Sequence, residues 1–238
     1  MSPLDAALWI TAAYLVGAVP FGLLLGFTRG VDIRTIGSGN IGATNARRAL
    51  GPALGNTAFV LDVLKGAAPV LAFGLAHDLI PPSPTPAAPT AVYAAVALAA
   101  ILGHVFPVYL RFKGGKGVAT SLGALAALYP FATLPTLAAL AVWIAALKLT
   151  RYVSVASIAA ALSLPLAVAA LAAPTDQTLS PHTFWDAAPV LAATALLAAL
   201  VVYRHRGNIA RLAAGEEPRV GSKKNDRPDP KPADDRTS

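Results

Sequence analysis

The sequence predicts an all-α integral membrane protein with seven transmembrane helices, an external N-terminus and a cytoplasmic C-terminus. Of its 238 residues, 55% are hydrophobic and 13% are charged, whereas soluble proteins carry about 25% charged residues. Five long segments contain no Asp, Glu, Lys or Arg, and the basic residues gather in a few clusters between them. These observations exclude a cytosolic globular fold, a disordered chain and a free nucleic-acid-binding module.

The apolar segments define the predicted helices. A transmembrane helix needs about 20 mostly apolar residues to cross about 30 Å of hydrocarbon. The stretch 49–80 meets this need because its charges are confined to Asp62, Lys65 and Asp78. A Pro-rich run at 81–86 cannot continue a helix and predicts a loop. We therefore expect helices over residues 4–27, 52–79, 88–111, 117–129, 131–148, 153–173 and 187–204.

Residues 117–147 decide the number of crossings. Lys116 and Lys148 both belong to basic clusters and are expected on the same side, so the 31 residues between them cross the membrane an even number of times. The dipeptide Tyr129-Pro130 supplies a break near the middle of this segment, which predicts two short helices. A protein with five spans, in which 117–147 forms a re-entrant hairpin, is the alternative.

The basic residues set the predicted orientation. All but one of the 19 Lys and Arg residues fall in 29–48, 111–116, 148–151 and the region from residue 204 onward. Cytoplasmic loops of membrane proteins collect Lys and Arg, so these clusters are expected inside, and the N-terminus and the loops at 81–86 and 174–186 outside. Residues 218–238 are rich in Pro, Lys and Asp, which predicts a disordered tail after a membrane domain of residues 1–217.

Residues 37–48 form the first of three polar clusters on the expected cytoplasmic side. They contain the spacing G-x-G-x-x-G, but no β-strand precedes it as a dinucleotide-binding fold requires. Small residues let backbone N–H groups approach an anion, and the start of a following helix adds a positive dipole. The donors expected in this cluster are Ser38, Asn40, Thr44, Asn45 and Arg48.

Two further clusters point to the same chemistry. Gly-His-Val-Phe-Pro at 103–107 is followed by Phe-Lys-Gly-Gly-Lys-Gly at 112–117, where glycines interleaved with lysines predict an anion-binding loop. This is not a Walker A loop, because Lys116 is followed by glycine. The third cluster is Tyr-Arg-His-Arg-Gly-Asn-Ile-Ala-Arg-Leu at 203–212. Together they predict that an anionic, phosphate-bearing ligand binds at the cytoplasmic membrane surface.

Ionisable residues also lie within predicted spans. Asp62 and Lys65 are three positions apart, so they share a helix face and can pair. Such groups are costly in a membrane and usually face a protein or water-filled interior. A structural ion pair and a component of the binding site are equal alternatives for them, and His104 is either a packing residue or part of the site. Cysteine is absent, which excludes disulfides and a cysteine nucleophile.

The three clusters, in this order and spacing, resemble those of the bacterial acyl-phosphate:glycerol-3-phosphate acyltransferases, the PlsY family. The resemblance rests on G-S-G-N-x-G-A-T-N, on G-H-x-F-P with F-K-G-G-K-G-V-A-T, and on Y-R-H-R-x-N-I-x-R-L, and it covers about residues 4–220. It implies a seven-helix enzyme that transfers a fatty acyl group from acyl phosphate to the 1-hydroxyl of glycerol 3-phosphate. The products implied are lysophosphatidic acid and inorganic phosphate.

The resemblance further implies a site that faces the cytoplasm from the bacterial inner membrane and needs no cofactor or metal. The implied partners are glycerol 3-phosphate, acyl phosphate, membrane lipids and the enzyme that produces acyl phosphate. The implied catalytic residues are Ser38, Arg48 and Lys116; the implied substrate-binding residues are Asn40, Thr44, Gly114, Gly115, Gly117, Ser157, His205 and Asn208; and Asp62, Lys65 and His104 are implied accessories.

The alternative to an enzyme is a membrane transporter or channel for a phosphorylated metabolite. The helices of such a protein would also present basic, glycine-rich ends to an anion. Against this alternative, the sequence shows no pair of matching half-repeats, and its charges cluster at one face of the membrane instead of at its midplane.

Overall fold

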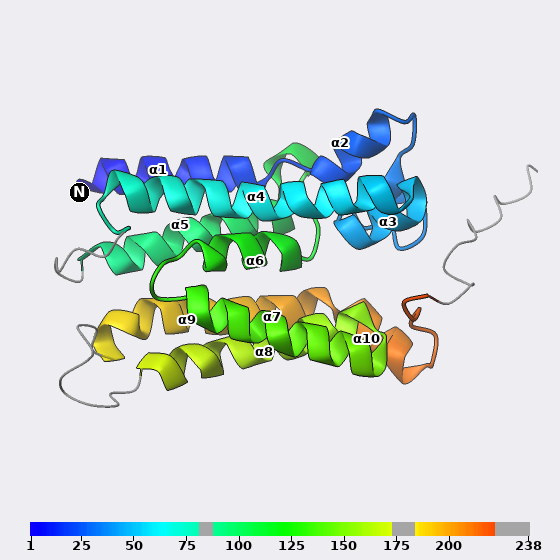
Figure 1. Cartoon of the computed structure of the whole chain (residues 1–238). Coiled ribbons are helices and arrows are strands. Elements are labelled where there is room, and N and C mark those ends of the chain that lie inside the picture. Colours follow the sequence, from blue (N-terminus) through cyan, green and yellow to red (C-terminus); the bar gives the residue numbers. More distant parts are fainter. Residues whose placement is uncertain (81–87, 173–183, 222–238) are drawn as a thin grey trace, which may run out of the picture.

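The computed structural model describes residues 1–80, 88–172 and 184–221, and these residues form helices joined by short turns (Figure 1). Three predicted segments fall wholly or mostly outside the described residues: the Pro-rich loop at 81–86, the loop at 174–186 and the tail at 218–238. The helices are α1 (Pro3–Gly17), α2 (Phe21–Phe27), α3 (Ala43–Leu50), α4 (Pro52–Ala76), α5 (Ala88–Val105), α6 (Val118–Ala126), α7 (Thr133–Thr150), α8 (Val153–Ala172), α9 (Phe184–Arg204) and α10 (Arg206–Ala213), with short 3₁₀ turns at Ile33–Thr35 and Val108–Leu110.

Helices occupy all seven predicted ranges, but they are not equally long. In the described part of the chain, six segments are long and apolar enough to cross a membrane: Pro3–Phe27, Pro52–Ala76, Thr90–Leu110, Thr133–Thr150, Val153–Leu171 and Ala187–Arg204. The first combines α1 and α2, which are separated by a break before Pro20. Helix α6 has nine residues, about 13 Å of helix, and is too short to span alone. The two helices expected within 117–148 are therefore present but unequal.

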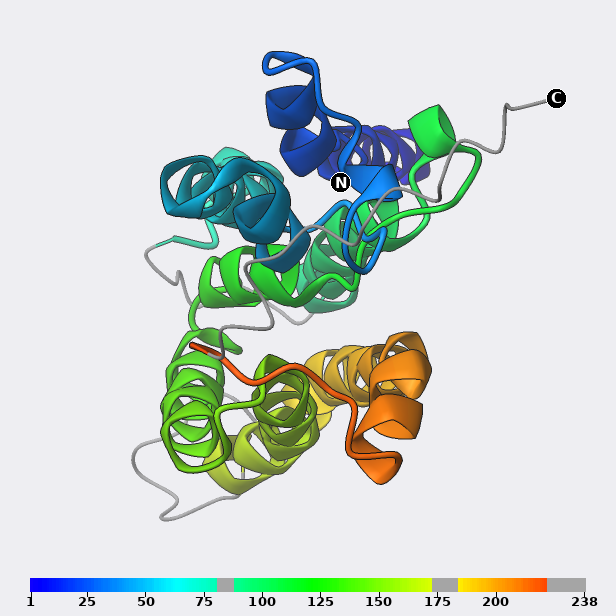
Figure 2. The ribbon, with the colours of Figure 1, turned by 90° about the vertical axis from the view of Figure 1, so that its right-hand side faces the viewer.

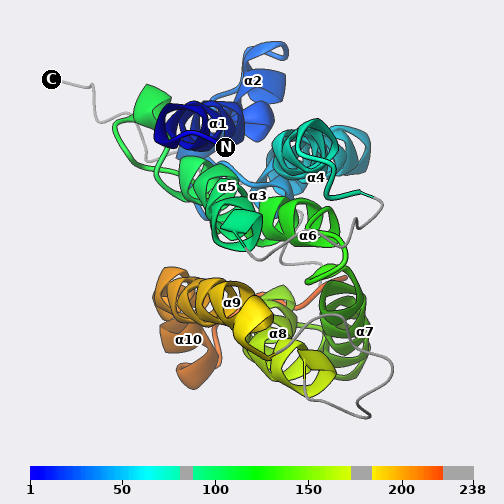
Figure 3. The ribbon, with the colours of Figure 1, turned by 90° about the vertical axis from the view of Figure 1, so that its left-hand side faces the viewer.

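The helices form two packed groups that lie side by side with their long axes aligned (Figures 1 and 3). One group contains α1 to α6, and the other contains α7 to α10. Contacts of α5 with α9 and of α6 with α7 join them. We call the end of the bundle that carries α2, α3 and α10 the basic end; Figure 2 looks onto it.

Glycines allow the closest helix packing in the first group. A side chain at Gly66 of α4 would meet the backbone of Thr120 in α6, and one at Gly123 of α6 would meet the backbone of Val63 in α4. Gly103 of α5 lies in the same way against the backbone of α1. Close backbone approach at small residues is the usual way in which membrane helices associate, because lipid supplies no hydrophobic drive between them.

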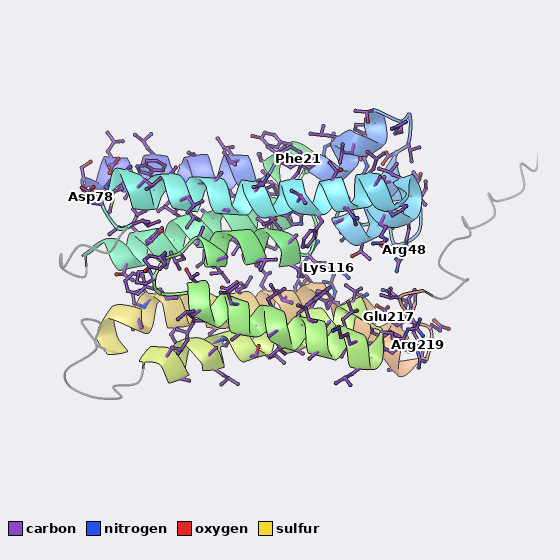
Figure 4. The ribbon with its side chains drawn as sticks, viewed as in Figure 1. Phe21, Arg48, Asp78, Lys116, Glu217 and Arg219 are labelled. Carbon is purple, nitrogen blue, oxygen red and sulfur yellow. The ribbon has the colours of Figure 1, made fainter. Side chains whose placement is uncertain are left out.

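The outer faces and the two ends differ in chemistry. Arg48, Glu217 and Arg219 lie at the basic end, and Asp78 lies at the opposite end (Figure 4). The sides of the bundle expose large apolar side chains, as expected of a surface that contacts lipid; examples are Leu64, Leu75, Leu149, Leu166 and Leu196.

Candidate functional site

The loop before α3 is held in shape by Asn45. The buried side chain of Asn45 donates from Nδ2 to the carbonyl oxygen of Ile33 at 2.8 Å, and its Oδ1 accepts from the N–H of Ser38 at 3.0 Å. The amide of Asn45, expected as a ligand donor, is therefore occupied within the protein. The hydroxyl of Ser38 stays exposed, and the Arg48 side chain passes beside Gly37.

A short turn made by Asn40 leads into α3. Asn40 Oδ1 accepts from the N–H of Gly42 at 2.9 Å, and Gly42 is the N-cap of α3. Thr44 is exposed in the first turn, and Arg48 is half-buried in the last turn. Burial lowers the pKa of Arg48, with Glu217 opposing this shift and Arg211 adding to it. An arginine remains charged despite such a shift, so Arg48 supplies a fixed cation.

The glycine-rich loop 114–117 packs tightly onto the end of α5. The N–H of Gly115 donates to the carbonyl oxygen of His104 at 3.1 Å. A side chain at Gly114 would meet the backbone of His104, and one at Gly115 would meet its imidazole. Gly117 has a φ of +83°, which favours glycine. Close packing therefore requires these glycines, in addition to the anion binding expected of them.

The second group of helices holds the loop from the other side. Arg204 donates from one nitrogen to the carbonyl oxygens of Gly114 and Gly115, at 2.7 and 3.0 Å. Within the described residues, the N–H groups of Gly114, Lys116 and Gly117 donate to no protein acceptor. Gly114 and Lys116 are partly exposed and Gly117 is buried, so the first two N–H groups are the more accessible to an anion.

Lys116 lies between the two groups of helices near the basic end (Figure 4). Its Nζ donates to Asn208 Oδ1. Burial is the main reason that the pKa of Lys116 is lowered to about 8; Glu217 opposes this shift, and the nearby cations Arg211, Arg48 and Arg204 add to it. Lys116 is thus a partly buried cation whose pKa is lowered toward the physiological range.

Glu217 completes this cluster and was not predicted. Its Oε1 accepts from Asn208 Nδ2 at 2.6 Å and from the Ser154 hydroxyl at 2.8 Å, and its Oε2 accepts from Arg211 Nε at 2.9 Å. Burial opposes ionisation, but these hydrogen bonds outweigh it and lower the pKa of Glu217 below its usual value. Asn208 is therefore oriented from both sides, by Lys116 and by Glu217. The sequence signal was slight: a carboxylate that follows a basic segment.

Two residues beyond the expected boundary of the membrane domain contact residues inside that domain. The N–H of Val220 donates to the carbonyl oxygen of Arg151 at 2.8 Å, and Arg219 donates to the Tyr152 hydroxyl at 2.9 Å. Arg219 and Val220, which fall within the predicted tail, therefore contact the two residues that precede α8.

His205 lies at the break between α9 and α10 and is buried. Its Nδ1 is 2.8 Å from the carbonyl oxygen of Val201. Because a carbonyl can only accept, Nδ1 carries the proton and a neutral His205 presents Nε2 as an acceptor. Burial, followed by the charge of Lys116, lowers the pKa of His205 to about 4. The imidazole is therefore uncharged at neutral pH.

Ser157 borders an apolar cavity between the two groups of helices. The cavity has a volume of about 120 Å³. Ser157 Oγ accepts from Trp143 Nε1 at 3.2 Å and donates to the carbonyl oxygen of Val153 at 2.8 Å. The cavity is lined by Phe59, Val118, Ser121, Leu122, Leu125, Thr136, Ala139, Leu140, Trp143, Ser157, Ala160, Ala161, Leu164, Leu197 and Val201.

The apolar cavity adjoins the cationic cluster. Val118 lies two residues after Lys116, and Val201 is the hydrogen-bond acceptor of His205. The arrangement can hold a molecule that has an anionic head and an apolar chain, because cations stand where the head would lie and apolar side chains line the space beyond.

Asp62, Lys65 and His104 form a separate buried cluster. Lys65 Nζ lies 2.7 Å from Asp62 Oδ1, a pairing that their spacing allows, and it donates to the carbonyl oxygen of Val19 at 2.6 Å. His104 Nδ1 lies 3.7 Å from the same carboxylate oxygen. The cluster does not line the cavity.

Comparisons with known proteins agree on one activity. A family model described as glycerol-3-phosphate acyltransferase matches residues 7–215. The glycerol-3-phosphate acyltransferase of Trichlorobacter lovleyi is 46% identical over 210 residues, which cover 88% of this chain and 94% of that protein. The enzyme of the same name from Myxococcus xanthus is 44% identical over 211 residues, 88% of this chain and 97% of that protein.

Solved structures show the same likeness. PlsY, an integral membrane glycerol 3-phosphate acyltransferase, matches in its glycerol 3-phosphate form with a TM-score of 0.75 and 39% identity, over 91% of this chain and 96% of that chain. The lysophosphatidic acid form of PlsY matches with a TM-score of 0.73 and 38% identity over the same shares.

Proposed function

This chain belongs to the glycerol-3-phosphate acyltransferase family, and we propose that it draws its acyl group from acyl phosphate. It is an integral membrane enzyme of phospholipid biosynthesis that acylates glycerol 3-phosphate. We assign the 1-hydroxyl as the acceptor and lysophosphatidic acid and inorganic phosphate as the products. The enzyme that makes acyl phosphate would be its supplier, and membrane lipids its surroundings.

The observation that carries the donor assignment is the apolar cavity beside Lys116. An acyl phosphate has a small anionic head on an apolar chain, and Lys116, Arg48 and the free N–H groups of loop 114–117 are suited to a phosphate. The chain would enter the cavity past Val118 and Val201. The bulky, polar carrier groups of other acyl donors would have to remain outside this space.

We assign roles from these positions. Arg48 and Lys116, together with the Ser38 hydroxyl, would stabilise negative charge on the reacting groups. Asn208, His205 and Ser157 would position the substrates, since Asn208 and His205 adjoin Lys116 and Ser157 borders the cavity. The remaining proposed donors to substrate phosphates are Asn40, Thr44, Gly114 and Gly117. Gly115 would contribute by shaping the loop, because its own N–H donates to His104.

The proposed transfer is direct. The hydroxyl oxygen of glycerol 3-phosphate attacks the acyl carbonyl carbon, the bond from that carbon to the phosphate oxygen breaks, and the departing phosphate takes the hydroxyl proton. Phosphate is a competent base, because the second pKa of a phosphate monoester lies near 6. The neutral His205 can accept a hydrogen bond from the hydroxyl through Nε2 and so orient it.

We further propose that the basic end faces the cytoplasm of a bacterial inner membrane and that the chain crosses seven times. One observation supports this topology: Arg48 and Arg219 lie at the same end of the bundle (Figure 4). The positive-inside rule assigns an end that is rich in Lys and Arg to the cytoplasm. The short α6 would complete its crossing with the turn that leads to α7. The N-terminus then lies outside and the C-terminus inside.

Purified enzyme in detergent tests the proposal. We expect phosphate release that requires both glycerol 3-phosphate and a long-chain acyl phosphate, and no product when acyl-CoA replaces acyl phosphate. Turnover with acyl-CoA at a comparable kcat/KM would contradict the donor assignment. Binding of glycerol 3-phosphate without turnover, followed by its uptake into proteoliposomes, would favour a transporter.

A further inference from the structure

We propose that His104 and Asp62 are positioning residues that hold loop 114–117 from within the membrane and thereby keep Lys116 in place. The inference builds on the proposed role of Lys116. It concerns a buried cluster that the reaction itself does not use, because neither residue lines the cavity or bonds to the Lys116–Asn208–Glu217 cluster.

The contact between His104 and the loop is direct. The carbonyl oxygen of His104 accepts from the N–H of Gly115, and the imidazole covers Gly115 so closely that a methyl group there would collide with it. Lys116 is the next residue in the chain. A shift of the imidazole therefore moves the backbone that carries Lys116.

The loop is held between two fixed points. His104 contacts it from the first group of helices, and Arg204 binds the carbonyl oxygens of Gly114 and Gly115 from the second. Lys116 then reaches Asn208 across the same boundary. If the His104 side chain is lost, the loop keeps its hydrogen bonds to Arg204 but loses the ring that fixes the position of Gly115 relative to α5. The Lys116 ammonium is then displaced.

Asp62 lies beside the His104 ring and can fix its orientation. Its Oδ1 faces Nδ1 of the imidazole at 3.7 Å, and a shift of roughly 1 Å would bring the two atoms into hydrogen-bond range. A carboxylate beside one ring nitrogen fixes the tautomer and the ring orientation, as it does for histidines that bind metals. The ring edge that carries Nε2 then stays against Gly115.

Lys65 holds Asp62 from the opposite side. Its Nζ forms an ion pair with the carboxylate and donates a hydrogen bond to the carbonyl oxygen of Val19, at the break between α1 and α2. Asp62, Lys65 and His104 are each at least 95% buried. Groups of this kind are costly in a membrane and tend to be functional, and a continuous chain of contacts from Val19 to Lys116 gives this cluster such a function.

The test compares three variants. His104→Phe keeps a ring over Gly115 but removes Nδ1, Asp62→Asn keeps the shape of the carboxylate but removes its charge, and Tyr93→Phe is the matched control. Tyr93 is also on α5 and fully buried, and its hydroxyl bonds to the carbonyl oxygen of Ala127 at 2.9 Å, far from the loop. We expect kcat to fall roughly 10- to 100-fold in the first two variants, the scale of a misplaced reacting group. Tyr93→Phe should lower the melting temperature about as much as the other two variants do, but it should keep kcat within about twofold of wild type.

A double-mutant cycle separates positioning from plain stability. If His104 acts through Lys116, adding His104→Phe to Lys116→Ala should lower kcat by less than about threefold, because the positioned group is already gone. Multiplied losses in the double variant, or unchanged kcat in both single variants, would overturn the inference while wild-type turnover leaves the proposed function intact. If His104→Phe does not fold, His104→Gln replaces it in the same cycle.

Discussion

Lys116 Nζ donates a hydrogen bond to Asn208 Oδ1 across the boundary between the two groups of helices, and the two residues are 92 positions apart in the chain. This contact joins the glycine-rich loop to the segment that follows α9. It also connects Lys116 to Glu217, because the Asn208 amide accepts from Lys116 and donates to Glu217. The three side chains form one hydrogen-bonded chain.

Lys116 is expected to act through its charge. Lys116→Ala should lower kcat/KM by roughly 100-fold or more, the scale of losing one strong transition-state donor, while the purified protein keeps its melting temperature within a few degrees. Steady-state kinetics with both substrates measures this change. A kcat/KM within about threefold of wild type would remove Lys116 from the site.

The charge of Lys116 also predicts an alkaline limb in the pH profile. Burial lowers the pKa of Lys116 to about 8, so the cation is present below this pH and is lost above it. The value of kcat/KM, which reports the free enzyme, should therefore fall as the pH rises through about 8. Arginine stays charged in this range, so Lys116→Arg should keep partial activity without the limb. An unchanged limb in that variant would assign it to another group.

Glu217 is expected to stabilise the basic end. Glu217→Ala would leave Asn208 Nδ2, the Ser154 hydroxyl and Arg211 without their acceptor, at a cost of about 1–3 kcal/mol that comes chiefly from the buried Ser154 hydroxyl. The melting temperature in detergent should fall by roughly 5–10 °C. Glu216 is exposed beside it, so Glu216→Ala is the control and should change little. Equal melting temperatures for both variants would contradict this role.

The apolar cavity is expected to select the acyl chain. Ala161 lines it from α8 and is almost fully buried, so Ala161→Leu would fill part of the space. Activity with a sixteen-carbon acyl phosphate should fall by about tenfold or more, while activity with a short-chain acyl phosphate changes little. Leu162→Ala alters the exposed face of the same helix and is the control. Equal losses with both chain lengths would place the chain elsewhere.

Much of this fold follows from where the charges stand. Runs with few or no charges located the long helices, because a charge inside lipid is costly, and the polar clusters located the basic end. Composition does not show which donors the protein uses for itself. Asn45 was expected to bind a ligand but clamps its own loop, and the N–H of Gly115 is bonded to His104. These pairings depend on helix packing that no local pattern encodes.

Glu217 shows the same limit at the end of the chain. It stands two residues after Gly215 and immediately before residues 218–238, whose composition predicts disorder. Its partners are Ser154 of α8 and Asn208 and Arg211 of α10, and only the tertiary arrangement of the basic end brings these two helices within reach of one carboxylate. Similarly, the apolar residues of the cavity look like lipid-facing residues in the sequence, and only the packing of α6 to α9 separates them.

The orientation in the membrane can be tested with single cysteines, because the chain contains none. Ser2 and Ala214 are exposed at opposite ends of the described structure. Ser2→Cys should react with an impermeant thiol reagent in intact cells, and Ala214→Cys should react only after permeabilisation, since Lys and Arg mark the cytoplasmic end. The reverse labelling pattern would overturn the topology and the cytoplasmic site.

His205 is expected to orient glycerol 3-phosphate without acting as the base. Its Nδ1–H is engaged by Val201, and its lowered pKa, about 4, makes Nε2 a weak base at neutral pH. A strong base is not required, because acyl phosphate is a mixed anhydride whose carbonyl is already activated and whose leaving phosphate can take the proton. An acidic limb near pH 6–7 in wild type would then belong to the substrate phosphates, whose second pKa lies near 6.

His205→Gln and His205→Ala distinguish orientation from base catalysis. Glutamine can still donate to Val201 and accept from the hydroxyl, so His205→Gln should keep most of kcat and an unchanged acidic limb. His205→Ala lacks the acceptor and should raise KM for glycerol 3-phosphate more than it lowers kcat at saturation, since a binding contact is lost in the ground state as well as in the transition state. Full pH profiles of kcat for wild type and both variants measure this. Loss of the acidic limb in His205→Gln, or trapping of a covalent acyl-enzyme, would replace direct transfer with a mechanism in which the protein supplies the base or the nucleophile.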